Sequence, residues 1–203
     1  MPQSAARPDE VANRHHPDFT RRLSLIFLAG LLLRVAYVLL VERGAPLSGD
    51  GIYYHEAANL LADGLGFTEP YRYLHGGAQE YLFAADPSAI ATSAYTALPV
   101  GHIEPTAGHP PLWVLVLGFS SMLGFTSVAA HQMLGALVGA VGVVAVGWAG
   151  RTLDGPRTGL IAAPIAAGHA CLWLSDGLDM SESLTLIQIS EPTRPERIAF
   201  LLL

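Results

Sequence analysis

The chain has 203 residues, of which 51% are apolar and 14% are charged, and its formal net charge is −6. A soluble domain carries about 25% charged residues, so this shortage, with a positive mean hydropathy, indicates a protein of the lipid bilayer. The acidic balance argues against a nucleic-acid partner, which normally meets a basic face. The single cysteine, Cys171, excludes an internal disulfide framework and is expected to be a small buried side chain.

The N-terminal segment, residues 1–22, is polar and is expected to be a cytoplasmic tail. It is too long to be the n-region of a usual cleavable signal peptide. The apolar run that follows, Leu23 to Val41, would rise about 28 Å as a helix, close to the thickness of a bilayer core. Arg21 and Arg22 precede this run, so the positive-inside rule places the N-terminus in the cytoplasm.

Residues 42–110 are polar and richer in carboxylates than in cations, which fits an external loop. One helix is predicted within this loop, from Ile52 to Ala62, because Tyr53, Ala57 and Leu60 recur at helical spacing and glycines follow. This short amphipathic helix is expected to lie at the membrane surface. No regular structure is predicted after it.

Three further apolar runs follow in the sequence. Leu112 to Phe125 would be about 21 Å long, which is short for a span and typical of interfacial or re-entrant segments. Val128 to Gly150 would reach about 34 Å and is expected to span. It contains a GxxxG pair, the spacing of small residues that lets helices pack closely, at Gly135 and Gly139. The run from Thr158 to Leu174 is a marginal but plausible span.

The topology depends on whether Leu112–Phe125 crosses the membrane. Arg151 and Arg157 flank the loop between the last two runs, and the positive-inside rule favours a cytoplasmic position for them. That position requires Leu112–Phe125 to stay on the outer side, whereas a spanning helix there would place both arginines outside. We therefore predict an all-α, polytopic transmembrane helix bundle with about three spans, at most four, and surface helices in the first outer loop.

This topology places six titratable side chains on one side of the membrane, although they are far apart in sequence. They are Asp50, His102, His109, Asp176, Asp179 and Glu182. Their convergence would favour an active site that faces outward.

Four segments, in this order and spacing, resemble the start of the GT-C glycosyltransferases. They are SGDGIYYHEAANLLADGLGF, PTAGHPPL, GRTLDGPRTGLIAA and LWLSDGLDMSES. The resemblance covers about residues 23–184 and is closest to the family-39-like group, which includes protein mannosyltransferases and lipid A aminoarabinose transferases. It implies a multi-pass protein of the cell membrane, a polyprenyl-phosphate sugar donor, and a protein, lipid or glycan acceptor. It also implies an acidic catalytic residue in the first outer loop, which maps onto Asp50.

Each candidate residue has a structural alternative. Asp50 would be the general base, or an ordinary turn residue in Ser-Gly-Asp-Gly. Tyr53 and Tyr54 would bind substrate, or lie at the interface as aromatic anchors. His109 would bind phosphate or a metal, or simply precede the prolines that open a helix. A divalent metal ion is an open cofactor candidate, with no ligand set assigned.

Three further substrate-binding candidates are less specific. Arg34 interrupts the first apolar run, and an intramembrane charge points to function unless it snorkels or pairs within the bundle. Asp176 and Glu182 are acceptor or metal candidates, or plain loop carboxylates. His131 and His169 lie in predicted helices, where we expect packed polar side chains.

The C-terminal stretch departs from the apolar pattern that the family resemblance predicts. Residues 185–203 include the string LIQISEPTR, which resembles a translated transposase-type sequencing adapter, although a native polar tail is the alternative. We interpret these residues as non-native or truncated, and residues 23–184 as the N-terminal part of a membrane domain that is inactive on its own. The rival functional class is a non-enzymatic polytopic membrane protein or a transporter fragment.

Overall fold

The structure is a computed structural model that describes residues 17–45, 47, 49–75, 100–106 and 108–177. All elements in these ranges are helical, apart from an isolated antiparallel bridge between Thr68 and Pro105. The helices are α2 (Pro17–Tyr37), η1 (Val38–Glu42), α3 (Asp50–Ala62), α4 (Pro70–His75), α7 (Pro111–Met122), α8 (Val128–Asp154), α9 (Pro156–Gly168) and α10 (Ala170–Gly177). The predicted tail at 185–203, with Asp179 and Glu182, lies outside the described residues.

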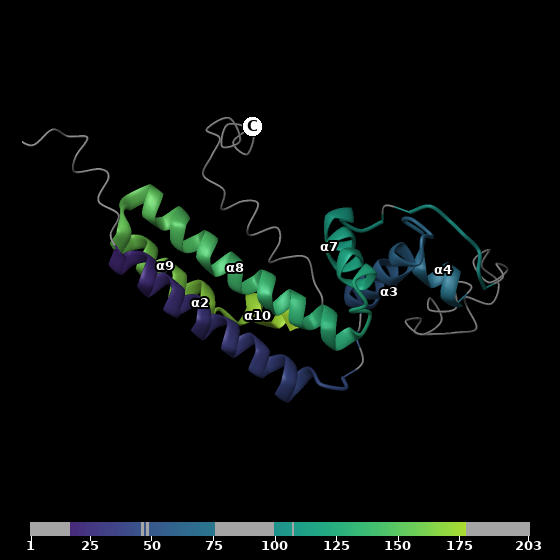
Figure 1. Ribbon diagram of the computed structural model, residues 1–203, viewed down its shortest axis with the longest axis horizontal. Helices are drawn as coiled ribbons and strands as arrows, with labels where there is room; N and C mark the ends of the chain where they lie inside the picture. The colour runs from purple at the N-terminus through teal and green to yellow at the C-terminus, as the bar shows by residue number, and fades with distance from the viewer. Residues whose placement is uncertain (1–16, 46, 48, 76–99, 107, 178–203) are drawn as a thin grey trace, which may run out of the picture.

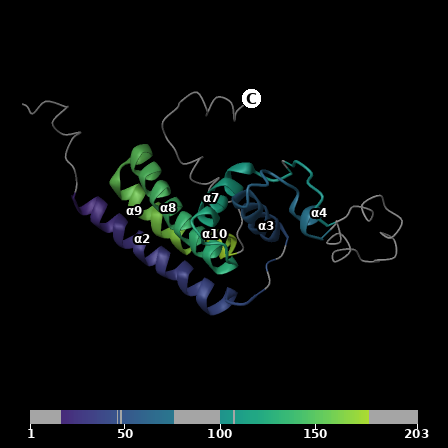
Figure 2. The same cartoon turned by 45° about the vertical axis from the view of Figure 1, so that its right-hand side comes forward.

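The helices form two groups. α2, α8, α9 and α10 make an elongated bundle, and α3, α4 and α7 lie together beyond one end of it (Figures 1 and 2). Each group has its own apolar core. The bundle core is Phe19, Leu23, Val143, Ala163, Ala166 and Ala167. The core of the α3–α7 group is Tyr53, Tyr54, Ala57, Ala58, Trp113, Val114 and Leu117.

Two helices in the described part of the chain are long and apolar enough to cross a membrane, Asp18–Glu42 and Val128–Asp154. At 1.5 Å per residue they extend about 37 Å and 40 Å, more than a bilayer core of about 30 Å. The helices predicted from the first and third apolar runs are therefore confirmed. The first one ends in a π-helical turn, Val38–Glu42, which sequence periodicity does not reveal.

The run from Thr158 to Leu174, a marginal span by its sequence, forms two helices rather than one. α9 ends at Gly168, and His169 takes an extended conformation (φ −70°, ψ 113°) before α10 begins. Gly168 is a poor helix former at the end of α9, and Pro164 removes a backbone hydrogen-bond donor inside the same helix. With 13 residues, α9 extends only about 20 Å. His169 is exposed at this break, so its expected packing inside a helix is wrong.

Glycines allow α8 and α9 to pack closely. A Cβ atom on Gly150 would lie 3.0 Å from the Cα atom of Gly159, and one on Gly159 would overlap the carbonyl oxygen of Gly147. Gly135 and Gly139, the predicted contact pair, are buried in α8. The close backbone approach at Gly147 and Gly150 was not anticipated, because the contact depends on where Gly159 of another helix falls.

The helices α3, α4 and α7 agree with the sequence prediction in part. α3 matches the helix predicted at 52–62 but starts at Asp50, and α7 matches the core of the short apolar run at 112–125. α4 contradicts the expectation of no regular structure after α3. Cys171 is exposed rather than buried.

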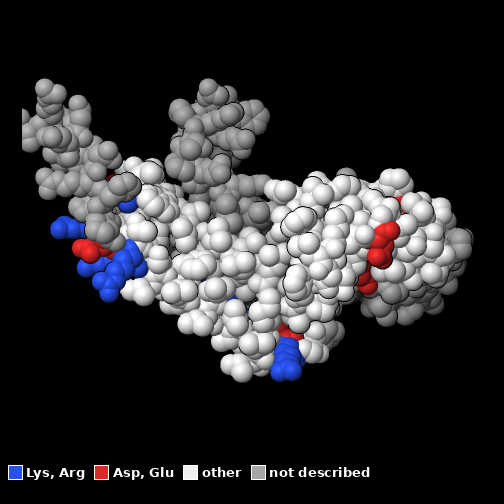
Figure 3. All heavy atoms as spheres, in the orientation of Figure 1, with Lys and Arg blue, Asp and Glu red and all other residues white. Residues whose placement is uncertain are grey.

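Basic residues gather at the end of the bundle where α2 begins and α8 meets α9 (Figure 3). Arg22 and Arg157 line a common recess there with Asp18 and Asp154. The guanidinium of Arg151 lies 4.6 Å from the ring centre of Phe19 and 4.8 Å from that of Trp148. The start of α2 and the loop before α9 therefore share one end of the bundle, as the predicted topology requires.

Candidate functional site

Asp50 is the first residue of α3, placed soon after the long α2–η1 helix ends. Gly49, immediately before it, has φ 57° and ψ −134°, a conformation that residues with a Cβ atom rarely adopt. The side chain of Asp50 is 59% exposed, so its carboxylate is open to an approaching molecule.

His109 meets Asp50 across 59 residues of sequence. Its Nε2 atom lies 3.2 Å from Oδ1 of Asp50. The imidazole stacks on Tyr53 with 3.9 Å between ring centres and meets the edge of Tyr54 at 5.4 Å. Its Nδ1 atom is buried and has no hydrogen-bond partner among the described residues. Pro111, two residues later, is at the start of α7, so His109 also precedes a helix as its structural alternative states.

Tyr71 of α4 belongs to the same cluster and was not identified from the sequence. Its hydroxyl donates to the carbonyl oxygen of Gly49 at 3.1 Å, and its ring meets that of Tyr53 edge-on at 5.9 Å. Burial, then the nearby carboxylates of Glu56, Glu69 and Asp50, raises the pKa of Tyr71 to about 12. The cluster is therefore aromatic with carboxylates beside it, and the phenol of Tyr71 stays protonated.

The segment before His109 is fastened to α4. Arg72 forms an ion pair with Glu104, and the backbone N–H of Glu69 donates to the carbonyl oxygen of Glu104 at 2.8 Å. His102 lies in this segment and is partly buried. These contacts restrict the path of the chain around Glu104 and help to place His109 beside Asp50.

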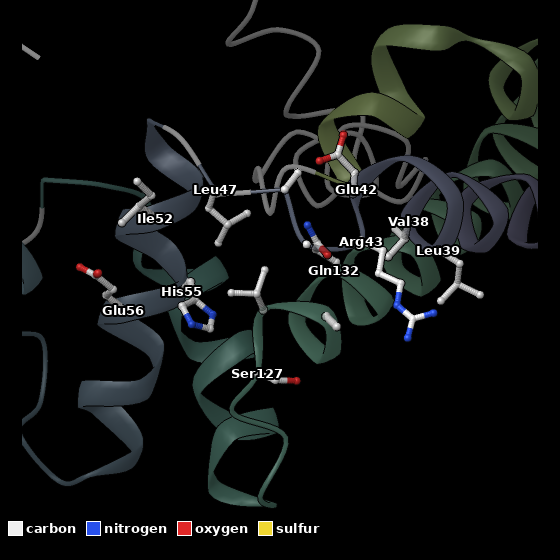
Figure 4. A pocket seen from close by; sticks show the side chains of 14 residues that line it. Val38, Leu39, Glu42, Arg43, Leu47, Ile52, His55, Glu56, Ser127 and Gln132 are labelled. Carbon is white, nitrogen blue, oxygen red and sulfur yellow. The ribbon is translucent and has the colours of Figure 1, made fainter. Parts of the chain in front are cut away.

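A cavity of about 830 Å³ lies on the neighbouring face of α3, between η1, the segment after it and the start of α8 (Figure 4). Its size is that of a small-molecule site. Ile52, His55 and Glu56 project from α3 on one side, and Glu42 and Arg43 lie on the other. Sequence reasoning missed this cavity because its lining comes from three separate segments.

Arg34 is not part of this cluster. It is 1% exposed within the bundle, where its Nη1 atom donates to the carbonyl oxygens of Gly30 at 3.2 Å and Ala167 at 3.5 Å. These bonds give the charge a structural role between α2 and α9. Asp176 lies in α10, but its side chain is outside the description.

The described residues contain no group of three or more His, Cys, Asp or Glu side chains that could hold a metal ion. Comparison with protein-family models found no matching family, and comparisons with curated proteins and with solved structures found no match. The cluster is therefore interpreted from its own chemistry. An exposed carboxylate with one oxygen bonded to an imidazole has a second oxygen with which to accept a proton.

Proposed function

We propose that the protein, in its full-length form, is a membrane glycosyltransferase that moves a sugar, such as mannose, from a polyprenyl-phosphate carrier to an acceptor. It would be a multi-pass protein of the cell membrane with its active site on the outer face. The observation that carries this proposal is the Asp50–His109 pair at the start of α3, just beyond the first long apolar helix. A lipid-anchored donor needs a reactive site at this kind of boundary between apolar helix and polar loop.

In this mechanism Asp50 is the general base. Its Oδ2 atom takes the proton of an acceptor hydroxyl while the hydroxyl oxygen attacks the anomeric carbon of the donor sugar. The bond between that carbon and the phosphate oxygen breaks, and the phosphate keeps the electron pair. One displacement of this kind inverts the anomeric configuration.

His109 is a positioning residue in this proposal. Its bond to Oδ1 fixes the carboxylate rotamer, and its stacking on Tyr53 fixes the imidazole plane. Fixing a base before the reaction lowers the entropic part of the barrier. Tyr53 and Tyr54 are buried beneath the pair and hold the imidazole of His109, while Tyr71 holds the turn at Gly49 through its hydroxyl.

The membrane topology follows from the same proposal. A short interfacial α7 and a cytoplasmic turn at Gly155, between α8 and α9, leave the Asp50 cluster outside. A third crossing would be made by α9 and α10 together, despite the break at His169. The arginines at the opposite end of the bundle support this orientation by the positive-inside rule.

The test is a transfer assay on purified full-length protein in liposomes. A polyprenyl-phosphate sugar labelled in the sugar is supplied with a mixture of membrane lipids, glycans and unfolded peptides as acceptors. We expect release of polyprenyl phosphate together with label in an acceptor, and no reaction with the corresponding sugar nucleotide. A protein that consumes neither donor under these conditions would contradict the proposal and favour a non-enzymatic membrane protein.

A further inference from the structure

Four polar side chains from three helices form a closed hydrogen-bonded ring, the Asn59–His55–His131–Ser121 ring. Nδ1 of His55 (α3) lies 2.9 Å from Nδ1 of His131 (α8), and Nε2 of His131 lies 2.9 Å from Oγ of Ser121 (α7). Oγ of Ser121 donates to Oδ1 of Asn59 (α3) at 2.8 Å. Nδ2 of Asn59 lies 3.4 Å from Nε2 of His55 and closes the ring.

The position of every proton in this ring can be deduced. Nδ2 of Asn59 also donates to the carbonyl oxygen of Thr126 at 3.2 Å, which fixes the amide orientation because a carbonyl can only accept. The hydroxyl of Ser121 donates its proton to Oδ1 of Asn59, so its oxygen accepts from Nε2–H of His131. His131 then accepts at Nδ1, and His55 must donate from its own Nδ1. Both imidazoles are therefore neutral, with the proton on Nε2 in His131 and on Nδ1 in His55.

An added proton cannot be accommodated while the Asn59 amide keeps its present orientation. A second N–H on His131 faces the N–H of His55 across 2.9 Å. Moving the His55 proton to Nε2 relieves that clash but points it at the NH₂ group of Asn59. Turning the amide of Asn59 gives that proton an acceptor, but it removes the bond from Asn59 to the carbonyl oxygen of Thr126 and leaves the hydroxyl proton of Ser121 without its acceptor. Each alternative leaves two donors face to face or a buried polar group unsatisfied, which costs about 1–3 kcal/mol.

The ring lies where the α3–α7 pair meets the bundle. His131 is fully buried, Ser121 is 5% exposed, and the side chains of Leu134 and Val138 of α8 pack against the α3–α7 core beside it. His55 also lines the cavity between α3 and α8. The ring therefore joins α3 to α8, and these two helices line different sides of the cavity.

We propose that the Asn59–His55–His131–Ser121 ring is an acid-operated latch, which holds α3 and α7 on α8 while neutral and releases them when a proton enters. Release widens the cavity and changes access to it. This inference concerns the contact of α3 and α7 with α8, and it does not rest on the proposed glycosyl transfer.

Few charged residues lie near the Asn59–His55–His131–Ser121 ring. Glu56 of α3 and the pair Glu42 and Arg43 line the same cavity as His55. α7 contains no titratable residue, and the other ionisable groups of α8, Arg151 and Asp154, lie at its far end. Burial lowers the pKa of His55, in agreement with a neutral ring.

The proton positions are tested by ¹⁵N NMR of histidine-labelled full-length protein in nanodiscs at about pH 7.5. Spectra of His55→Asn and His131→Gln proteins assign the signals. We expect His55 as the Nδ1–H tautomer, which is the minor form of free histidine, and His131 as the Nε2–H tautomer. A charged imidazole at either position, or His55 protonated on Nε2, would overturn the latch.

The release is tested by the distance between spin labels at Asp63 and Leu137, both exposed, in a Cys171→Ser protein. Acidification from about pH 7.5 to about pH 4.5 should lengthen and broaden the distance reversibly. The double variant His55→Asn/His131→Gln keeps donors near the two original N–H positions but cannot titrate, and should show no change. His169→Gln, at an exposed site, should respond like wild type. An acid response that survives in the double variant, or none in wild type, refutes the proposal, and the NMR result decides if the double variant does not fold.

Discussion

Nε2 of His109 lies 3.2 Å from Oδ1 of Asp50, which joins the residue that begins α3 to the segment that leads into α7. The pair is stacked against Tyr53 and open to solvent on the Asp50 side. Asp50 and His109 were both candidates from sequence, and the structure brings them together with Tyr53 and Tyr54. This contact carries the functional proposal.

Loss of the His109 imidazole should weaken catalysis through the orientation of Asp50. A hydrogen bond to a charged group contributes about 1.5–3 kcal/mol, so His109→Ala should lower kcat by about 10- to 100-fold. His109→Gln can place an amide N–H near the position of Nε2–H and should recover part of the loss. Its pH–rate profile should follow wild type. Equal losses in the Ala and Gln variants, with an unchanged KM, would show that the bond to Asp50 is unimportant.

Gly159 should tolerate no side chain. A Cβ atom there would overlap the carbonyl oxygen of Gly147, so Gly159→Ala must push α9 away from α8. We expect a loss of about 1–3 kcal/mol of stability, measured as a lower midpoint of thermal unfolding in detergent. Gly168→Ala is the matched control, since a Cβ atom at Gly168 meets nothing within 4 Å. Equal midpoints for both variants would show that α8 and α9 are not closely packed.

The orientation in the membrane can be read from cysteine labelling in a Cys171→Ser protein. Thr152 lies at the arginine-rich end and Asp63 at the end of α3, and both are exposed. In intact cells an impermeant maleimide should label a cysteine at position 63 and leave one at position 152 unlabelled until the membrane is opened. The reverse pattern would invert the topology, and labelling at both positions would require a different number of spans.

Acid should destabilise the protein partly through His55. Burial lowers its pKa in the folded state, whereas the unfolded side chain has a pKa of about 6.5. Below about pH 6.5 the unfolded chain binds a proton that the folded chain does not, so the free energy of unfolding falls as the pH falls. His55→Asn should flatten the decline of the unfolding midpoint between about pH 7 and pH 5. An unchanged slope in this variant would assign the acid sensitivity to other groups.

The long helices were predictable because their signal is local. The apolar residues of Asp18–Glu42 and Val128–Asp154 run almost without charge, and the glycines after α3 end it within the predicted range. The break at His169 was missed because a 17-residue apolar run hides the effects of Pro164 and Gly168. Apolar content alone does not distinguish one helix from two.

The features that sequence could not supply depend on tertiary contacts. The six residues of α4 have no helical periodicity of their own, and α4 is tied to a distant segment by the Arg72–Glu104 ion pair. Tyr71 was therefore not a candidate. His131 was expected to be a packed polar residue and is buried, but its partner His55 is 76 residues away. Arg34 was a functional candidate as an intramembrane charge, and its acceptors on α2 and α9 could not be predicted from the sequence.

The most direct measurement is the single-turnover rate of full-length Asp50→Asn protein with a bound polyprenyl-phosphate sugar. Asparagine keeps the size and polarity of Asp50 but cannot accept the proton, so the rate should fall by about 10²- to 10⁴-fold while donor affinity stays close to wild type. Asp63→Asn, at the other end of α3, should react at nearly the wild-type rate. An Asp50→Asn protein that kept more than about a tenth of the wild-type rate, with chemistry rate-limiting, would contradict the assignment of Asp50 as the base.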